Sequence, residues 1–69
     1  MFPIKRLEKM HEELYRYYLQ IITFQNENPQ YQNIAIKLSR NLSELGEIIE
    51  NIRIYNTYNK NNSLLHIFK

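Results

Sequence analysis

The sequence has 69 residues, no cysteine and a formal net charge of +2, and these three facts limit what the protein can be. A chain of this length forms one domain at most, so we treat residues 1–69 as a single domain. Without cysteine it has neither disulfide bridges nor thiolate metal sites, and it fits the cytoplasm better than a small secreted protein. The charged N-terminus does not suit a signal peptide, and no apolar run is long enough to cross a membrane.

Charges are balanced along most of the chain, and the excess of positive charge comes from Lys60 and Lys69 near its end. A nucleic-acid-binding protein needs a basic stripe that neutralises several phosphates. No such stripe is present, so we do not expect nucleic acid as a partner.

The first predicted element is an α-helix over residues 3–25. Pro3 suits the first turn, where the N–H that proline lacks has no helical partner. Lys5 can reach Glu8, and Glu12 can reach Arg16, at the spacings that place two side chains side by side on a helix. The apolar residues follow helical spacing: Ile4, Leu7, Met10, Leu14, Tyr17, Tyr18, Ile21 and Phe24.

The second predicted element is an α-helix over residues 29–55 that carries a heptad pattern. Asn28 and Pro29 form a start signal, with Asn28 as N-cap and Pro29 at the first helical position. The apolar seam advances by alternating steps of four and three: Tyr31, Ala35, Leu38, Leu42, Leu45, Ile49 and Ile52. Such a seam packs against another helix. Because the link between the two helices is short, we expect an antiparallel hairpin.

Further apolar residues flank the seam of each helix, and we expect them to widen the stripe that joins the two helices. On the second helix these are Ile34, Ile48 and Tyr55, and on the first they are Met10, Tyr17 and Phe24. Gly46 is the only glycine and lies in mid-helix, where glycine costs about 1 kcal/mol relative to alanine. A surface position or a slight bend explains it more simply than the close approach of another backbone.

Residues 56–69 are predicted to be a polar linker and tail. The stretch from Asn56 to Asn62 is rich in residues that disfavour helices. Ser63 can cap a short third helix that carries Leu64, Leu65, Ile67 and Phe68. This turn either folds back on the hairpin or anchors a partner.

Apolar residues that a two-helix hairpin cannot cover are the predicted interface. They are Tyr15, Leu19, Ile22, Ile36, Ile54, Leu64, Leu65 and Phe68. Exposed apolar surface of this extent usually marks a protein interface. The sequence therefore predicts an all-α, coiled-coil-like antiparallel hairpin that forms a four-helix bundle with a second copy or docks into a larger complex.

Residues able to carry out catalysis are scarce. The chain contains no aspartate, and its two histidines, His11 and His66, are far apart in sequence. His11 falls in the seam of the first helix, where a packing role is expected. Glu44, Glu47 and Glu50 share one helix, and we interpret them as a solvated surface. We expect no catalytic, cofactor-binding or metal-binding residues and no cofactor.

Two short stretches resemble known families. The stretch from Leu38 to Ser43 is similar to the signature of the small two-helix sporulation phosphatases of bacilli, which remove phosphate from a response-regulator aspartate. Only Ser39 and Leu42 match that signature, and Ser43 stands where the family has its aspartate. The tripeptide Leu14-Tyr15-Arg16, with Phe24 downstream, is similar to the motif of mitochondrial LYR adaptors.

The sequence favours a non-enzymatic protein-interaction module, either a self-associating regulator or a small subunit of a larger assembly. Its expected partner is a protein or a second copy of the chain, and no membrane is expected. The alternative is a hairpin phosphatase of the sporulation type that lacks its key aspartate.

Overall fold

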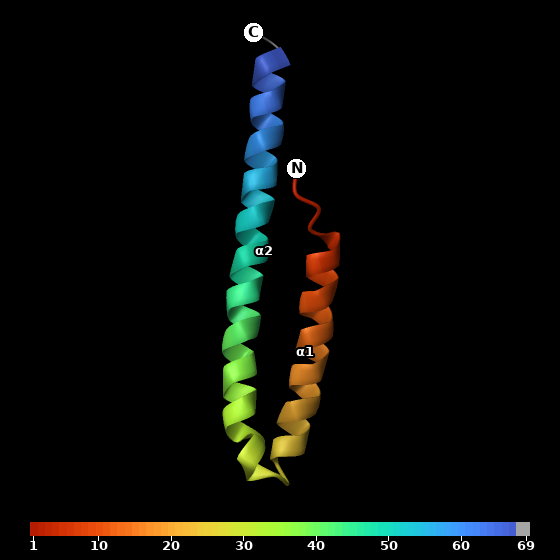
Figure 1. The fold of residues 1–69 in the computed structure, drawn as a ribbon, viewed down its shortest axis with the longest axis vertical. Helices are drawn as coiled ribbons and strands as arrows, with labels where there is room; N and C mark the ends of the chain where they lie inside the picture. The colour runs from red at the N-terminus through yellow and green to blue at the C-terminus, as the bar shows by residue number, and fades with distance from the viewer. Residues whose placement is uncertain (68–69) are drawn as a thin grey trace.

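The fold is an antiparallel hairpin of two helices (Figure 1). The computed structural model describes the backbone of residues 1–67 and the side chains of residues 1–59. Helix α1 spans Lys5–Gln25, a 3-10 turn η1 spans Pro29–Tyr31, and helix α2 spans Gln32–Ile67. The hairpin is 63 Å long. The predicted all-α hairpin is confirmed.

Helix α1 begins at Lys5 rather than at Pro3, because Phe2 is held outside the helix. The Phe2 N–H donates to Asn56 Oδ1 at 3.0 Å, and Asn56 Nδ2 donates to the Phe2 carbonyl at 2.9 Å. The Phe2 carbonyl therefore accepts a hydrogen bond from Asn56 of α2 and does not accept the first hydrogen bond of α1. The first helical bond runs from Glu8 N–H to the carbonyl of Ile4.

The turn between the helices differs from the predicted cap in two respects. Pro29 does occupy the first position of the following helical turn, but that turn is a 3-10 turn that precedes α2. The Asn28 side chain does not cap it, and instead Nδ2 donates back to the Phe24 carbonyl at 3.1 Å. The rings of Phe24 and Tyr31 meet edge to face at 4.9 Å and close this end of the hairpin.

Helix α2 continues to Ile67, where the sequence predicted a polar linker after Tyr55. The stretch from Asn56 onward contains weak helix formers but neither glycine nor proline. Each weak former costs at most about 0.7 kcal/mol, and extending an existing helix needs no new nucleation. The helix therefore has no stop signal, and it extends past the beginning of α1 (Figure 1).

The core of the hairpin is narrow. Ala35, Leu42 and Ile49, which occupy every seventh position of α2, are the only buried side chains in residues 1–59. The other half of the predicted seam, which includes Leu38, Leu45 and Ile52, is half-buried. No residue of α1 is buried. One neighbouring helix covers only part of an apolar stripe of this width.

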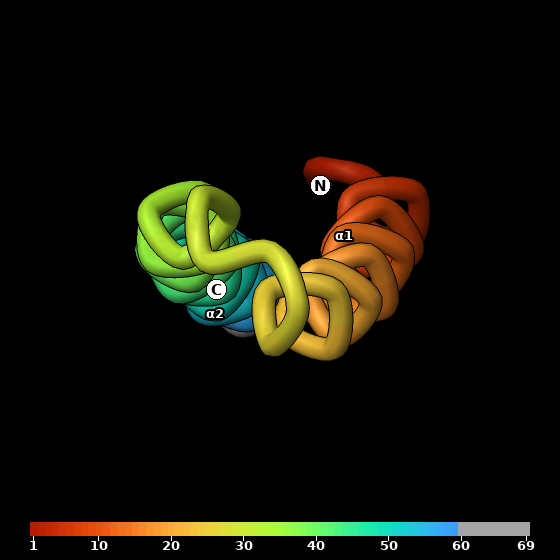
Figure 2. The backbone as a smooth tube through the Cα atoms, turned by 90° about the horizontal axis from the view of Figure 1, so that it is seen from below, coloured from red at the N-terminus to blue at the C-terminus, as the bar shows by residue number. Residues whose placement is uncertain are grey.

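The described helices form a single layer. Viewed along the long axis, α1 and α2 lie side by side, and no third described element covers either broad side of the pair (Figure 2). Each helix therefore has one side against its neighbour and two flanks that face solvent. The chemistry of these flanks decides what the molecule can bind.

Candidate protein-interaction surface

Contacts between the helices fix which flank of α1 lies beside which flank of α2. Residues seven apart make nearly two full turns and lie on almost the same side of a helix, and we call such a set a row. The row of Glu8 and the row of Phe24 lie on opposite flanks of α1, separated by the rows that pack on α2. Glu8 contacts Arg53, and Phe24 contacts Tyr31. The hairpin therefore has two distinct faces, one on the side of Glu8 and Arg53 and the other on the side of Phe24 and Tyr31.

A polar contact between His11 and Leu42 joins the helices in the middle of the hairpin, beside Gly46. His11 Nε2 lies 2.9 Å from the Leu42 carbonyl oxygen. Because a carbonyl only accepts, Nε2 carries the proton and donates it. A Cβ at position 46 would lie 3.4 Å from this same nitrogen. A side chain larger than a methyl group at position 46 would meet the His11 ring, so Gly46 leaves room for His11 to reach the backbone of α2.

Neither sequence-based explanation of Gly46 was complete. The residue is half-buried, so the surface position is wrong. The group that approaches it is the His11 ring and not another backbone. The interpretation of His11 as a partly buried packing residue is confirmed, with a hydrogen bond to α2 in addition.

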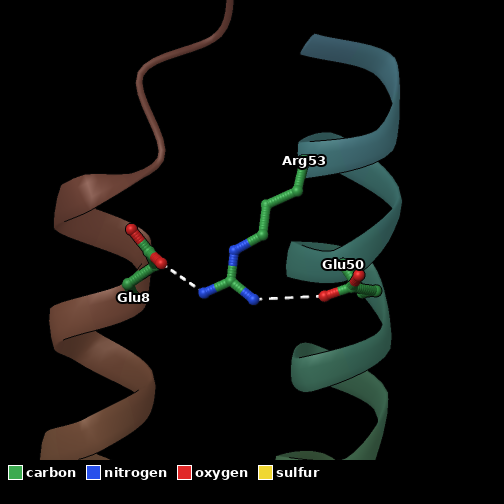
Figure 3. A network of polar contacts seen from close by, with 3 residues as sticks. All are labelled: Glu8, Glu50 and Arg53. Atoms are coloured by element: carbon green, nitrogen blue, oxygen red, sulfur yellow. Dashed lines mark hydrogen bonds and ion pairs between the residues drawn. The ribbon is translucent and has the colours of Figure 1, made fainter. Parts of the chain in front are cut away.

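One face carries a bridge of charges between the helices (Figure 3). The Arg53 guanidinium donates to the Glu8 carboxylate on α1 and, at 3.1 Å, to the Glu50 carboxylate on its own helix. The hydrogen bond to Glu8, and then that to Glu50, raise the pKa of Arg53 above its usual value. Glu8 therefore pairs across the hairpin and not with Lys5, whereas the predicted pair of Glu12 and Arg16 is present at 3.1 Å.

We call this side the ion-paired face. Its outward rows mix charged, polar and apolar side chains: Glu8, Tyr15, Leu19, Ile22, Ile36, Ser43, Glu50 and Arg53.

The other side, which we call the charge-free face, contains no Glu, Lys, Arg or His residue. It is formed by one row of α1 and by two rows that run through η1 and α2: Met10, Tyr17, Phe24, Tyr31, Ile34, Leu38, Asn41, Leu45, Ile48, Ile52 and Tyr55. Six of these large apolar side chains are between 46% and 65% exposed: Met10, Tyr17, Phe24, Ile34, Ile48 and Tyr55. Tyr17 and Phe24 of α1 and Tyr31 of η1 line one shallow depression, so the surface continues from α1 into the turn that leads to α2.

The residues predicted from sequence as an interface, where their side chains are described, lie on or beside the ion-paired face. Tyr15, Leu19 and Ile36 are exposed on the ion-paired face, and Ile22 is half-buried there. Ile54 is exposed beside Glu50 and Arg53. The backbone of Leu64 and Leu65 belongs to α2, but their side chains lie outside the described residues, as does Phe68.

Sequence reasoning missed the charge-free face because it assigned those residues to the contact between α1 and α2. Ile34, Ile48 and Tyr55 flank the seam, and a single α1 helix does not reach them. The sequence signal that could have identified this face is the absence of charged residues from the rows that form it. Charged residues interrupt the rows that contain Ile36 and Tyr15, but none interrupts the row of Ile34 and Ile48.

The residues that resembled a phosphatase signature lie in the middle of α2. Ser39 and Ser43 are exposed, whereas Leu42 is one of the three buried side chains. Within the described residues, no group of three or more His, Cys, Asp or Glu side chains could hold a metal ion. Of the three glutamates that share one helix, Glu44, Glu47 and Glu50, Glu50 is ion-paired with Arg53.

Neither described helix combines the length and the apolar character needed to cross a membrane. Comparison with known protein families, with characterised proteins and with solved structures finds no match to this chain. A proposal for its function therefore has to come from the geometry of the two faces.

Proposed function

We propose that this protein is a non-enzymatic helical interaction module whose binding surface is the charge-free face. It acts as a self-associating regulator or as a small subunit of a larger assembly, and the lack of cysteine fits a cytoplasmic location. The observation that carries the proposal is the row-by-row absence of charge on one face of a chain in which 23% of the residues are charged.

The size of the exposed apolar surface supports this proposal. Six large side chains at roughly half exposure offer on the order of 600 Å² of apolar surface. Contiguous apolar patches beyond a few hundred Å² are rare on monomeric proteins and commonly mark interaction sites. The ion-paired face offers fewer apolar residues, and Glu8, Glu50 and Arg53 lie among them.

The thin core supports the proposal as well. A hairpin with three buried side chains in its described part has little apolar burial to offset the entropy of folding. A partner helix on the charge-free face would bury Leu38, Leu45 and Ile52, which are now half-buried. Binding would thus complete a core and stabilise the folded chain.

Position-specific photo-crosslinking in cells that express the protein tests this function. A photoreactive amino acid is placed at Ile48 on the charge-free face or, as the matched control, at Ile36 on the ion-paired face. The two isoleucines belong to the same helix and are 50% and 44% exposed. We expect protein adducts from position 48 and far fewer from position 36.

Equal adduct yields from the two positions, or no adduct from position 48, would contradict the proposal. Circular dichroism of each labelled chain checks that the helices are intact. An adduct with any protein chain, including a second copy, agrees with the proposed function, and the identity of the partner is a separate question.

A further inference from the structure

We propose that the partner of the charge-free face is a second copy of this chain, packed face to face and antiparallel, with the two-fold axis passing beside Asn41. This inference rests on the proposed function and names its partner. The result is an antiparallel four-helix bundle in which α2 contacts the α2 of the second copy and α1 contacts the α1 of the second copy.

The pattern along α2 is self-complementary about Asn41. Ile34 lies seven residues before Asn41 and Ile48 lies seven residues after it. When two α2 helices run antiparallel with their Asn41 residues opposed, Ile34 of each copy therefore faces Ile48 of the other. In the neighbouring row, Leu38 of each copy lies opposite Leu45 of the other copy, with an offset of one residue along the helix. An isologous dimer interface requires this property, since one surface must match itself.

Asn41 is the only side chain on the charge-free face that is neither aliphatic nor aromatic, and it lies at the centre of that pattern. Its side-chain amide both donates and accepts hydrogen bonds, so two copies of Asn41 can satisfy each other. A single asparagine in an apolar seam is a known device for fixing register and orientation between helices. A partner with an uninterrupted apolar surface would leave this amide without a hydrogen-bond partner.

The first helix fits the same arrangement. Tyr17 follows His11 by six residues, and the His11 ring lies against Gly46 of the antiparallel helix. Tyr17 is therefore about level with Asn41, near the proposed axis. In the dimer, Tyr17 of one copy lies close to Tyr17 of the other, where two aromatic rings can pack together.

Charge and area agree with self-association. Acidic and basic residues balance over residues 1–59, and none lies on the charge-free face, so a second copy meets no like-charge repulsion there. Each copy offers on the order of 600 Å² from its six most exposed apolar residues, and the half-buried row adds to this. A standard interface buries about 800 Å² per partner, so the face is of the right size.

The first test is the mass of the purified full-length chain in solution, measured by sedimentation equilibrium over a range of concentrations. We expect a dimer. Ile48→Glu places a charge on the charge-free face and should raise the dissociation constant at least tenfold. Ile36→Glu, with similar exposure in the same helix, should leave it unchanged. Circular dichroism confirms that both variants are helical.

The second test uses the absence of cysteine, which makes single-cysteine variants unambiguous. Two packed helices have axes 8–10 Å apart and Cα radii near 2.3 Å, so opposed Cα atoms are roughly 3.5–5.5 Å apart. This range overlaps the Cα separation of disulfides. We expect Asn41→Cys to form a disulfide-linked dimer under mild oxidation, and the control Ser43→Cys, on the ion-paired face, to remain mostly monomeric.

A monomeric parent chain would overturn this inference, as would dissociation by Ile36→Glu in place of Ile48→Glu. Cross-linking of Ser43→Cys at the rate of Asn41→Cys would overturn it too, and so would a dimer in which Asn41→Cys stays reduced. If the chain is monomeric but position 48 photo-crosslinks to a different protein, the inference fails and the proposed function stands. If neither self-association nor position-specific adducts occur, both fail.

Discussion

Gly46 shows how a single missing side chain shapes the contact between the helices. The carbonyl of Leu42 lies one turn before Gly46, and a side chain at position 46 would stand beside it. His11 uses the open space to donate a hydrogen bond to that carbonyl. The contribution of such a bond is about 0.5–1.5 kcal/mol, similar to the cost of a glycine in the middle of a helix.

Replacing Gly46 with alanine is expected to stabilise the protein. The added Cβ would meet His11 Nε2 at 3.4 Å, which is ordinary van der Waals contact, so the hydrogen bond to Leu42 can persist. The gain in helix propensity is up to about 1 kcal/mol. Thermal unfolding followed by circular dichroism should show a higher midpoint for Gly46→Ala.

The comparison variant is Gly46→Leu, which also has high helix propensity but carries a side chain too large for the space beside His11. We expect it to displace the ring and lower the midpoint relative to Gly46→Ala. If Gly46→Ala is itself less stable than the parent, the ring and a methyl group cannot share this space, and our account of Gly46 is wrong.

At the scale of the helices, the row of Ala35, Leu42 and Ile49 holds the hairpin together. Leu42→Asp would place an uncompensated charge in the centre of this row, at a cost of several kcal/mol. The total stability of small domains is only about 5–15 kcal/mol, so we expect the variant to be largely unfolded. Ser43→Asp, on the exposed neighbouring residue, is the control. Equal melting curves for the parent and Leu42→Asp would disprove the assignment of the core.

The extension of α2 beyond Tyr55 leads to a separate prediction. The overhanging end of the helix lies beyond the start of α1, so its helicity depends on continuity with the rest of α2 (Figure 1). Asn61→Pro removes a backbone donor and clashes with the preceding turn, which costs about 3 kcal/mol in a helix interior. We expect loss of helical signal from the end of α2 and little change in the melting midpoint of the hairpin.

Residue-resolved Cα chemical shifts would check this prediction, because they report helicity for each residue. Asn61→Ala, which favours helix, should show helical shifts through the end of α2. If the parent chain already has non-helical shifts from residue 56 onward, the polar stretch is a linker, as the sequence alone suggested.

At the scale of the whole molecule, folding and association are expected to be coupled, since residues 1–59 of the hairpin bury only three side chains. Asn41→Leu is the informative change here. A leucine would extend the apolar surface and strengthen association, but it would remove the feature that selects one register. We expect a higher melting midpoint together with more than one set of amide signals in a two-dimensional NMR spectrum.

Asn51→Leu, on an exposed row outside both defined faces, is the matched control, and it should leave a single set of signals. A single set of signals for Asn41→Leu as well, with an unchanged mass, would show that Asn41 does not select the arrangement. The midpoint alone could not decide this, because an added leucine can stabilise a helix without contacting a partner.

Local sequence patterns were sufficient for the architecture of this protein. The heptad spacing from Tyr31 to Ile52, together with the short link at Asn28 and Pro29, predicted two antiparallel helices and the buried row that joins them. These features depend on helical periodicity and on local backbone preferences, both of which can be read from neighbouring residues. The end of α2 was missed because weak helix formers without glycine or proline do not stop a helix that is already formed.

Only the tertiary structure decided which apolar residues are covered and which are not. Ile34 and Ile48 look like core residues in the sequence, but α1 approaches α2 from the side of Gly46 and Arg53 and leaves them exposed. The register that brings His11 to Gly46 and Phe2 to Asn56 likewise depends on contacts between residues far apart in the chain. Periodicity fixes the directions of side chains around one helix, whereas the position of a neighbouring helix follows from packing, and so the charge-free face became visible only when both helices were placed.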